Sequence, residues 1–213
     1  MNGSEVSSSS ADDLNSFVAA AGLEPLPPEI AEKFDKYLAL ILHWNARMNL
    51  TAIRDPQEIL TRHFVESIAC SRHLPANIET LLDFGSGAGF PGIPIALCRP
   101  EITVTLAESQ SKKAAFLREA IRRLGLNSLV FAERAESLGR EFDCVTLRAV
   151  DQMERAVAAA SGLVRRGGWL AIMTTTEKLP EVKAAAGSQF GWSDPTFLPP
   201  SDHRVLAISS RAA

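Results

Sequence analysis

A glycine-rich run is the strongest chemical signal in the chain. Residues 81–92 read Leu-Leu-Asp-Phe-Gly-Ser-Gly-Ala-Gly-Phe-Pro-Gly, where a short apolar stretch gives way to a helical pattern. Glycines at such a strand-to-helix turn let the backbone bend sharply and approach a ligand without obstruction by side chains. We therefore expect this turn, with Gly85 and Gly87, to bind a ligand.

The details of the run indicate which ligand. A dinucleotide fingerprint reads G-x-G-x-x-G, but here the third glycine, Gly89, comes one residue early and Phe90 occupies its place. Asp83 precedes the glycines, and its carboxylate would repel a pyrophosphate and favour the ammonium and sulfonium of S-adenosylmethionine. No Gly-Lys-Ser/Thr follows, which argues against a phosphate-binding P-loop. We predict S-adenosylmethionine as the cofactor.

Two further polar residues end apolar stretches. Glu108 follows Gly89 by about 20 residues, the place of an acidic side chain that accepts the ribose hydroxyls of a nucleoside. Dinucleotide enzymes share this marker, so it indicates a nucleoside without choosing between the two ligands. Arg148 stands at the end of another apolar strand, where burying its charge without a partner would be costly. We expect it to point into the ligand crevice.

The elements that must position these residues alternate regularly after Pro75. Strands alternating with helices predict an α/β fold, a doubly wound, mostly parallel sheet. Residues 190–208 add two weak strands that could form an antiparallel edge. The expected strands lie near 80–84, 102–107, 128–132, 142–147 and 168–174, and the expected helices near 91–98, 112–124, 151–162 and 177–185.

The part before Pro75 is read as helical. Apolar residues recur at helical spacing after Pro28, and Asp55, Pro56 and Glu58 form a capping box that begins a further helix. We expect a disordered tail over 1–12, a helical N-terminal extension over 13–75 and a methyltransferase domain over 76–213.

Composition excludes several classes of protein. The 213 residues are 46% hydrophobic and 22% charged, with no apolar run long enough to span a membrane and no signal peptide. Cys70, Cys98 and Cys144 lack Cys-x-x-Cys spacing, so we expect buried free thiols, no metal site and a cytoplasmic protein. A net charge of −3 means that RNA binding would need a local basic face. The candidates for that face are Lys112, Lys113, Arg118, Arg122 and Arg123.

Missing motifs narrow the target of methylation. No Asn/Asp-Pro-Pro-aromatic sequence, which marks methylation of exocyclic amino groups, follows the fourth expected strand. No Pro-Cys occurs that could place a cysteine to attack a pyrimidine ring. The remaining targets include a ring nitrogen that is already nucleophilic.

With these motifs, the chain resembles the ribosomal RNA small-subunit methyltransferase G family, also called the glucose-inhibited division protein B family. The resemblance runs from about Leu38 to Met173. Ser86 stands where threonine is usual, and Glu66 where aspartate is usual. The specific segments are 83–94, 108–113 and Arg148-Ala149, with Trp44-Asn45, 48–51, Arg62-His63-Phe64 and Glu66-Ser67 upstream.

The resemblance implies a Rossmann-like class I methyltransferase that modifies N7 of one guanine in 16S ribosomal RNA. It implies that Gly85 and Phe90 line the cofactor site, that Ala135 and Glu136 flank the adenine, and that Arg148 lies beside both cofactor and target base. Asn49 is a candidate for a polar contact to the guanine, or else an ordinary turn asparagine. We expect 16S ribosomal RNA or the small ribosomal subunit as partner, and a monomer that binds neither membrane nor metal.

Three other functions stay open at this point. A nicotinamide-dependent oxidoreductase conflicts with the early third glycine and Asp83. A non-catalytic cofactor-binding or RNA-binding module conflicts with the intact glycines, Glu108 and Arg148. A methyltransferase acting on a protein or a small molecule would share most of these signals.

Overall fold

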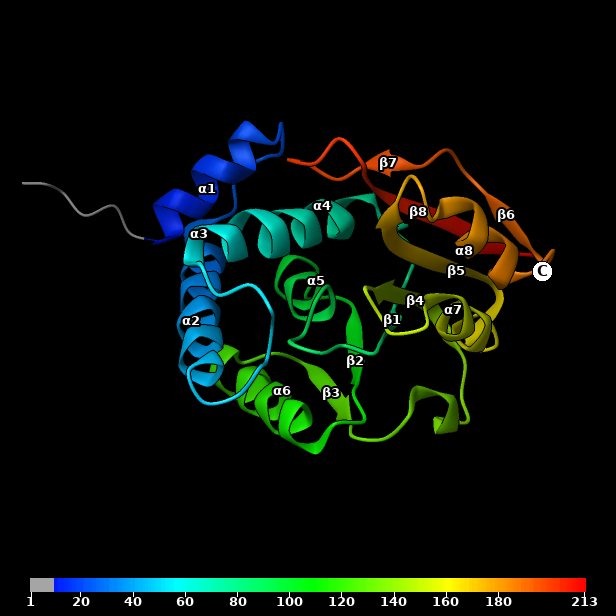
Figure 1. The fold of residues 1–213 in the computed structure, drawn as a ribbon, viewed down its shortest axis with the longest axis horizontal. Helices are drawn as coiled ribbons and strands as arrows, with labels where there is room; N and C mark the ends of the chain where they lie inside the picture. The colour runs from blue at the N-terminus through cyan, green and yellow to red at the C-terminus, as the bar shows by residue number, and fades with distance from the viewer. Residues whose placement is uncertain (1–9) are drawn as a thin grey trace, which may run out of the picture.

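The computed structural model describes residues 10–213, which form a sheet covered by helices on both faces (Figure 1). The strand order is β3-β2-β1-β4-β5-β8-β6, and β7 pairs with β8. The strands are β1 (Thr80–Phe84), β2 (Thr103–Ala107), β3 (Ser128–Phe131), β4 (Phe142–Arg148), β5 (Val164–Thr175), β6 (Phe190–Trp192), β7 (Thr196–Phe197) and β8 (Arg204–Arg211).

The first five strands are parallel, and the strands that follow β5 are antiparallel to their neighbours. β1 lies between β2 and β4, so the chain reverses its direction of winding at β1. Ligands of open α/β sheets bind at such a switch point, beyond the carboxyl ends of the strands. The predicted doubly wound α/β fold with an antiparallel edge is confirmed.

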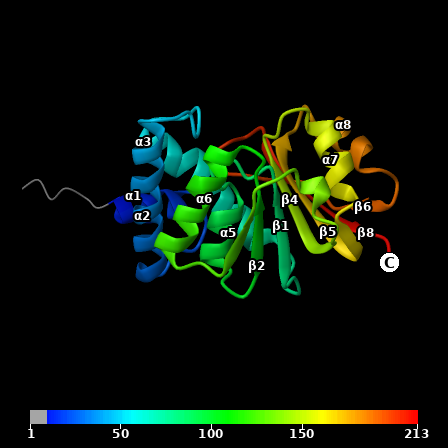
Figure 2. The ribbon, with the colours of Figure 1, turned by 90° about the horizontal axis from the view of Figure 1, so that it is seen from below.

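Alternating side chains of the central strands explain the layers. Leu81 packs into one hydrophobic cluster and Leu82 into another, because successive strand residues face opposite sides of a sheet. The helices α5 (Gly92–Cys98) and α6 (Ser111–Leu124) cover the first face, while α7 (Met153–Ser161) and α8 (Leu179–Ala186) cover the second. Figure 2 shows the sheet between these two layers.

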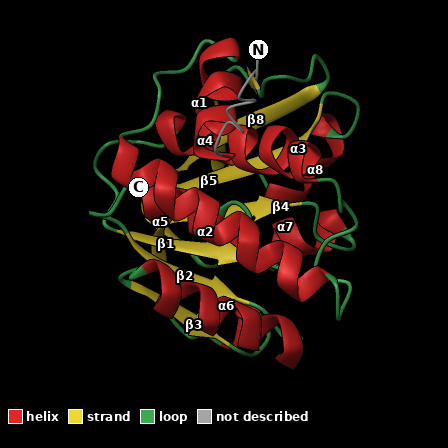
Figure 3. Cartoon of the chain, turned by 90° about the vertical axis from the view of Figure 1, so that its left-hand side faces the viewer, coloured by secondary structure: helices red, strands yellow, loops and turns green. Residues whose placement is uncertain are grey.

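The N-terminal helices add to the first face. They are α1 (Ser10–Ala20), α2 (Pro28–Asn45), α3 (Pro56–Glu58), a π-helical stretch η1 (Ile59–Val65) and α4 (Glu66–His73). As the capping box predicts, Asp55 caps α3 by accepting the backbone N–H of Glu58 at 2.9 Å. Their apolar side chains share one core with β1 and β2. Figure 3 shows α2 lying across the sheet on this side.

The expected tail needs a correction at its end. Residues 1–9 lie outside the described part, but Ser10, Ala11 and Asp12 already belong to α1. Leu14 and Val18 on that helix are buried, and the Ser10 hydroxyl bonds to Asp35 at 2.7 Å, which explains why the helix begins early. Among the helices of residues 10–213, none is long and apolar enough to cross a membrane.

Candidate functional site

The glycine turn lies at the switch point of the sheet, where it joins the end of β1 to the start of α5. Gly89 has a φ of +92°, and a Cβ there would lie 2.5 Å from Cδ1 of Ile93, so this glycine is required for packing. Gly87 also has a positive φ, +58°, but a Cβ there would meet nothing nearer than the Gly85 carbonyl oxygen at 3.9 Å. The turn is therefore packed tightly behind Gly89 and open beside Gly87, on the side where a ligand would approach.

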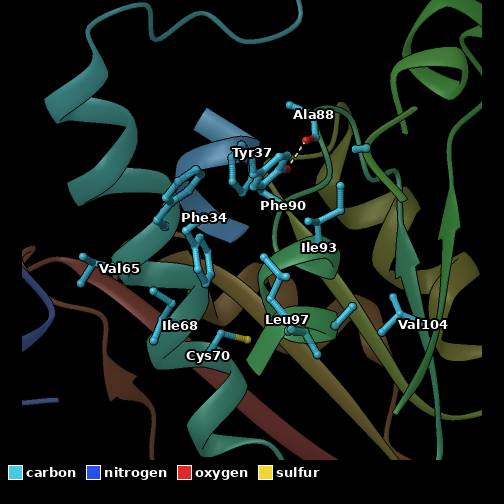
Figure 4. Packing of buried hydrophobic residues seen from close by; sticks show 14 of the residues in the cluster. Phe34, Tyr37, Val65, Ile68, Cys70, Ala88, Phe90, Ile93, Leu97 and Val104 are labelled. Carbon is cyan, nitrogen blue, oxygen red and sulfur yellow. Dashed lines mark hydrogen bonds between the residues drawn. The ribbon is translucent and has the colours of Figure 1, made fainter. Parts of the chain in front are cut away.

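Aromatic side chains hold the turn from behind (Figure 4). The buried Tyr37 of α2 donates its hydroxyl hydrogen to the Ala88 carbonyl. Burial raises the pKa of Tyr37 well above its ordinary value, so the hydroxyl keeps its proton for this bond. Phe90 packs against both Tyr37 and Phe64, with ring centroids 5.5 and 5.8 Å away. The N-terminal helices thus fix the glycine turn directly.

Glu108 joins the end of β2 to the turn. Its carboxylate accepts the backbone N–H of Gly87 at 3.0 Å and that of Gln110 at 2.7 Å. The residue is 7% exposed and stands just before α6. A carboxylate has about four lone-pair sites, so two acceptor positions are available beyond these bonds. The structure places Glu108 beside Gly87, where both would meet the same ligand.

Asp83 has a different role from the one expected. It is fully buried on the α5 side of β1, and its two carboxylate oxygens accept the Gly92 N–H at 3.2 Å and the Thr146 hydroxyl at 3.1 Å. Burial raises the pKa of Asp83 to about 6, although these hydrogen bonds act in the opposite direction. Asp83 therefore anchors the start of α5 from inside the core, a role that the sequence did not predict, and its effect on the charge of the ligand stays a prediction.

The segment after β3 reaches the same edge of the sheet. The Glu108 N–H donates to the Phe131 carbonyl at 3.0 Å, so the ends of β2 and β3 are neighbours. A short 3-10 helix, η2 (Ala135–Ser137), follows, with Ala135 buried and Glu136 exposed in an ion pair with Arg134 at 2.7 Å. Their contact with an adenine stays a prediction.

Arg148 ends β4 inside a buried cluster of charges. Its Nη2 donates to the Glu66 carboxylate at 2.8 Å and to the Arg62 carbonyl. Glu66, on α4, is 2% exposed and also accepts Nη1 of Arg204 from β8, with each carboxylate oxygen at 2.8 Å. The guanidinium of Arg148 lies 5.8 Å from the centroid of the Phe90 ring. The expected ligand-side arginine therefore has a protein partner, and it touches the glycine-rich run.

His63 of η1 completes this region. Its ring stacks on Phe90 with centroids 4.6 Å apart, and Nε2 bonds to the Thr51 hydroxyl at 3.0 Å. Burial, followed by the charges of Arg148, Arg204 and Arg62, lowers the pKa of His63 to about 3, so the imidazole stays neutral at physiological pH.

Unpartnered polar atoms occur among these residues and their neighbours in sequence. Four buried side-chain nitrogen or oxygen atoms of residues 10–213 lack a hydrogen-bond partner, and three belong to His63, Ser67 and Arg148. Such atoms are rare in folded proteins, and each calls for an explanation. A polar ligand at the end of β4 would explain the Nη1 atom of Arg148.

A cavity of about 190 Å³ opens beside Arg148. The backbone of Ala149, next to Arg148, has a φ of +49°, which is uncommon for a residue with a Cβ and is often found at functional sites. A larger groove of about 450 Å³ lies between α2 and α6, and it contains Arg123 of the predicted basic face but none of the residues predicted to bind the cofactor or the target base. The smaller cavity is lined by Glu66, Arg148, Ala149, Val150, Met153, Met173, Thr174, Thr175, Lys178, Leu198 and Arg204.

Asn49 is not brought into this cluster. It is exposed in the turn after α2, and its side-chain oxygen accepts Nη2 of Arg54 at 2.8 Å. The turn itself is held by Asn45, whose side-chain oxygen accepts the N–H groups of Leu50 and Thr51, each at 3.0 Å. A contact between Asn49 and the target base stays a prediction.

The sequence reasoning missed Arg204 and gave Glu66 no function. Arg204 was assigned no role because it lies beyond the part of the chain, Leu38 to Met173, that carries the resemblance. A lone arginine opening the apolar stretch Arg204–Ile208 was an available signal, since burial of that charge requires a partner. Glu66 was likewise an acidic residue within an apolar helical pattern.

Comparison with known proteins agrees with this geometry. The GidB family model, described as rRNA small subunit methyltransferase G, matches residues 30–190. Two relatives carry the name ribosomal RNA small subunit methyltransferase G. The one from Xanthomonas euvesicatoria is 43% identical over 161 residues, covering 74% of each chain. The one from Xanthomonas campestris is 40% identical over 183 residues, covering 84% of this chain and 85% of its own.

Solved structures share the fold. A protein of Agrobacterium tumefaciens, described as a predicted O-methyltransferase, superposes with a TM-score of 0.58 at 23% identity over 70% of this chain and 81% of its own. TYW2 from P. horikoshii in complex with MeSAdo gives a TM-score of 0.58 at 14% identity over 71% of this chain and 63% of its own. These likenesses concern the class I methyltransferase fold. The match over most of the chain shows that it belongs to the rRNA small subunit methyltransferase G family.

Proposed function

We propose that this protein transfers a methyl group from S-adenosylmethionine to N7 of a guanine in 16S ribosomal RNA. The observation that carries the proposal is the meeting of two sites at one edge of the sheet. The glycine turn bonds to Glu108 through Gly87, and the residue that follows the turn, Phe90, touches Arg148. A cofactor site and a polar site for a substrate therefore adjoin each other.

The residues of the first site suit the cofactor. Gly85 and Gly87 leave the backbone of the turn accessible, Glu108 can accept ribose hydroxyls, and Ala135 with Glu136 follow β3 at the same edge. S-adenosylmethionine supplies an electrophilic methyl group on a positively charged sulfur when it is bound. The protein's task at this site is to hold the nucleoside and to leave the methyl group facing the end of β4.

The residues around the second site suit a nucleophile that needs no base. Guanine N7 carries a lone pair and no proton, so methylation requires alignment of the reacting atoms more than proton transfer. The base becomes cationic as the bond forms, and a further positive charge beside it would oppose the reaction. His63 meets this requirement because its low pKa keeps it neutral, and Glu66 offsets part of the charge of Arg148.

The partner is 16S ribosomal RNA, alone or within the small ribosomal subunit, and the protein acts as a cytoplasmic monomer. Base edges are best reached in unpaired RNA, where a nucleotide can turn out of the stack. Asn49, exposed in the turn next to Thr51, would contact the RNA beside the target base.

Mapping of methylated nucleosides in 16S ribosomal RNA tests the proposal. RNA from cells lacking the gene should lose one 7-methylguanine, and the intact gene should restore it. A gene encoding Arg148→Ala should restore it poorly, although the purified variant still binds the cofactor. An unchanged set of methylated guanines in the deletion strain would contradict the proposal, and a lost mark on another base or on a protein would redirect it.

A further inference from the structure

The cavity at the ends of β4 and β5 contains an unusual excess of positive charge. Arg148 and Arg204 share the single carboxylate of Glu66, and Lys178 adds a third cation to the lining. Arg148 is 7% exposed at its side chain, and its Nη1 has no partner. Three cations and one anion leave two positive charges without compensation, so the cavity attracts an anion.

The hydrogen-bonding character of the cavity is equally one-sided. Arginine and lysine side chains only donate hydrogen bonds, and both oxygens of Glu66 already accept bonds from the arginines. Thr174 and Thr175 also line the cavity, and a threonine hydroxyl can donate to an anion. The N7–O6 edge of guanine also presents only acceptors, but N7 must face the methyl group during the reaction and cannot accept a hydrogen bond from an arginine at the same time. A phosphate presents acceptors alone and matches the cavity.

The charge of the product makes such an anion necessary. N7-methylguanine is cationic, and two uncompensated charges at the end of β4 would raise the energy of any cation that forms nearby. A phosphate bound in the cavity would neutralise them before the methyl group moves. The cavity would then favour the reaction only when a nucleotide is seated correctly.

We propose that this cavity binds a backbone phosphate of the nucleotide whose base is methylated, held by Arg148, Arg204 and Lys178. The inference rests on the proposed function, because it assumes an RNA substrate at this edge of the sheet. It assigns Lys178 and Arg204 to substrate binding.

Small ligands can test the site without a ribosomal particle. The probes are guanosine, guanosine 5′-monophosphate and guanosine 3′-monophosphate, titrated into full-length protein saturated with S-adenosylhomocysteine and followed by NMR. One monophosphate should bind about tenfold or more tightly than guanosine, since charge-assisted bonds to arginine are strong. The two isomers distinguish the phosphate on the 5′ side of the target from that on the 3′ side.

Two variants and one control locate the effect. Lys178→Ala removes an exposed side chain and should reduce the advantage of the monophosphate about threefold or more. Arg204→Lys keeps the charge beside Glu66 but loses the planar guanidinium, which can bind a phosphate through two parallel N–H groups, and should also reduce the advantage. Lys183 lies on α8 but packs over Trp192, outside the cavity. Lys183→Ala should therefore leave the advantage of the monophosphate unchanged.

Equal affinity for guanosine and both monophosphates would overturn the inference, and so would an absence of binding by all three at millimolar concentration. An equal loss in Lys183→Ala would also overturn it, because the effect would then be unspecific. Methylation of 16S ribosomal RNA is measured in parallel. If the RNA is methylated but the phosphate gives no advantage, only this inference fails; if the RNA is never methylated, the proposed function fails.

Discussion

The two halves of the site are built in opposite ways. The half over β1 and β2 consists of backbone groups and one carboxylate, and Glu108 lies only 21 residues from its partner Gly87. The half over β4, β5 and β8 consists of long charged side chains, and Arg204 lies 138 residues from its partner Glu66. The first half is local in sequence and carries the negative charge of Glu108, whereas the second is assembled from distant elements and is cationic.

This difference separates two physical tasks. A nucleoside cofactor is the same in every reaction cycle, so a turn of fixed shape can bind it. An RNA strand is held through its charge, and charge is supplied by side chains that several elements must bring together. The predictions below test whether the two halves are independent in stability and in binding.

The largest effect is expected at Glu66, where replacement by glutamine leaves two arginine side chains without their shared anion. Breaking a buried ion pair costs about 3–5 kcal/mol, and urea unfolding at pH 7 measures the loss. Glu66→Asp keeps the charge and should lose distinctly less. Equal losses in the two variants would show that shape, and not charge, holds this half together.

The next effect concerns the cofactor half. Gly85 has a φ of +72°, and a Cβ there would lie 3.2 Å from Cγ2 of Val150. Gly85→Val should weaken S-adenosylmethionine binding roughly hundredfold, or about 2.7 kcal/mol, in calorimetry. Gly125→Val is the matched control, because Gly125 has a similar φ of +62° with nothing within 4 Å. Unchanged affinity in folded Gly85→Val would remove the turn from the cofactor site.

A smaller effect follows from the pKa of Asp83. Its folded value of about 6 exceeds the ordinary 3.8, so its contribution to stability is complete below pH 3.8 and is lost as the pH rises through 6. His63 acts in reverse, because its pKa of about 3 makes stability fall as the pH drops below 6.5. Lowering the pH from 7 to 5 should therefore stabilise the wild type relative to Asp83→Asn by about 1 kcal/mol. If the wild type and Asp83→Asn differ by the same free energy of unfolding at pH 7 and at pH 5, the raised pKa of the buried Asp83 is contradicted.

The sequence predicted the cofactor half well and the other half poorly. The glycine turn, the place of Glu108 and the alternation of strands with helices follow from local patterns, because a strand-to-helix turn has few solutions. Arg148 was identified, but its partners were not, since pairing of Glu66 with Arg204 depends on where β8 enters the sheet. Asp83 shows the opposite failure: its position was read correctly, but the face of β1 on which it lies decides what its carboxylate touches.

The basic face of α6 offers a weaker test of RNA binding. Lys112 lies on the first turn of this helix, close to Gln110, whose backbone N–H binds the Glu108 carboxylate. Arg122 lies on the last turn. If Lys112 contacts a phosphate, Lys112→Ala should reduce the salt dependence of RNA affinity by about one unit of slope. Arg122→Ala, at the far end of the helix, should change the slope less. An unchanged slope in Lys112→Ala would contradict a phosphate contact by this residue.

The smallest effect is expected at the cysteines. Cys70 and Cys144 are buried as predicted, while Cys98 is half-buried, and all three are free thiols. Burial raises the pKa of Cys98 to about 11 and that of Cys70 to about 12, so neither is a ready nucleophile at pH 7. Single alanine variants should methylate RNA within about twofold of the normal rate, because attack by a ring nitrogen needs no covalent intermediate. Loss of turnover in a folded variant would refute this.

The place of β8 in the sheet also sets an order of events during synthesis. β8 pairs with β5 and β6, and Arg204, at its start, follows Glu66 and Arg148 in the chain. A nascent chain of about 180 residues already contains every residue of the cofactor half, yet its Glu66 has only Arg148 to bind. The protein should thus be able to bind a nucleoside before it can bind RNA. A chain interrupted before residue 204 should bind the cofactor without competing for unmodified ribosomal RNA.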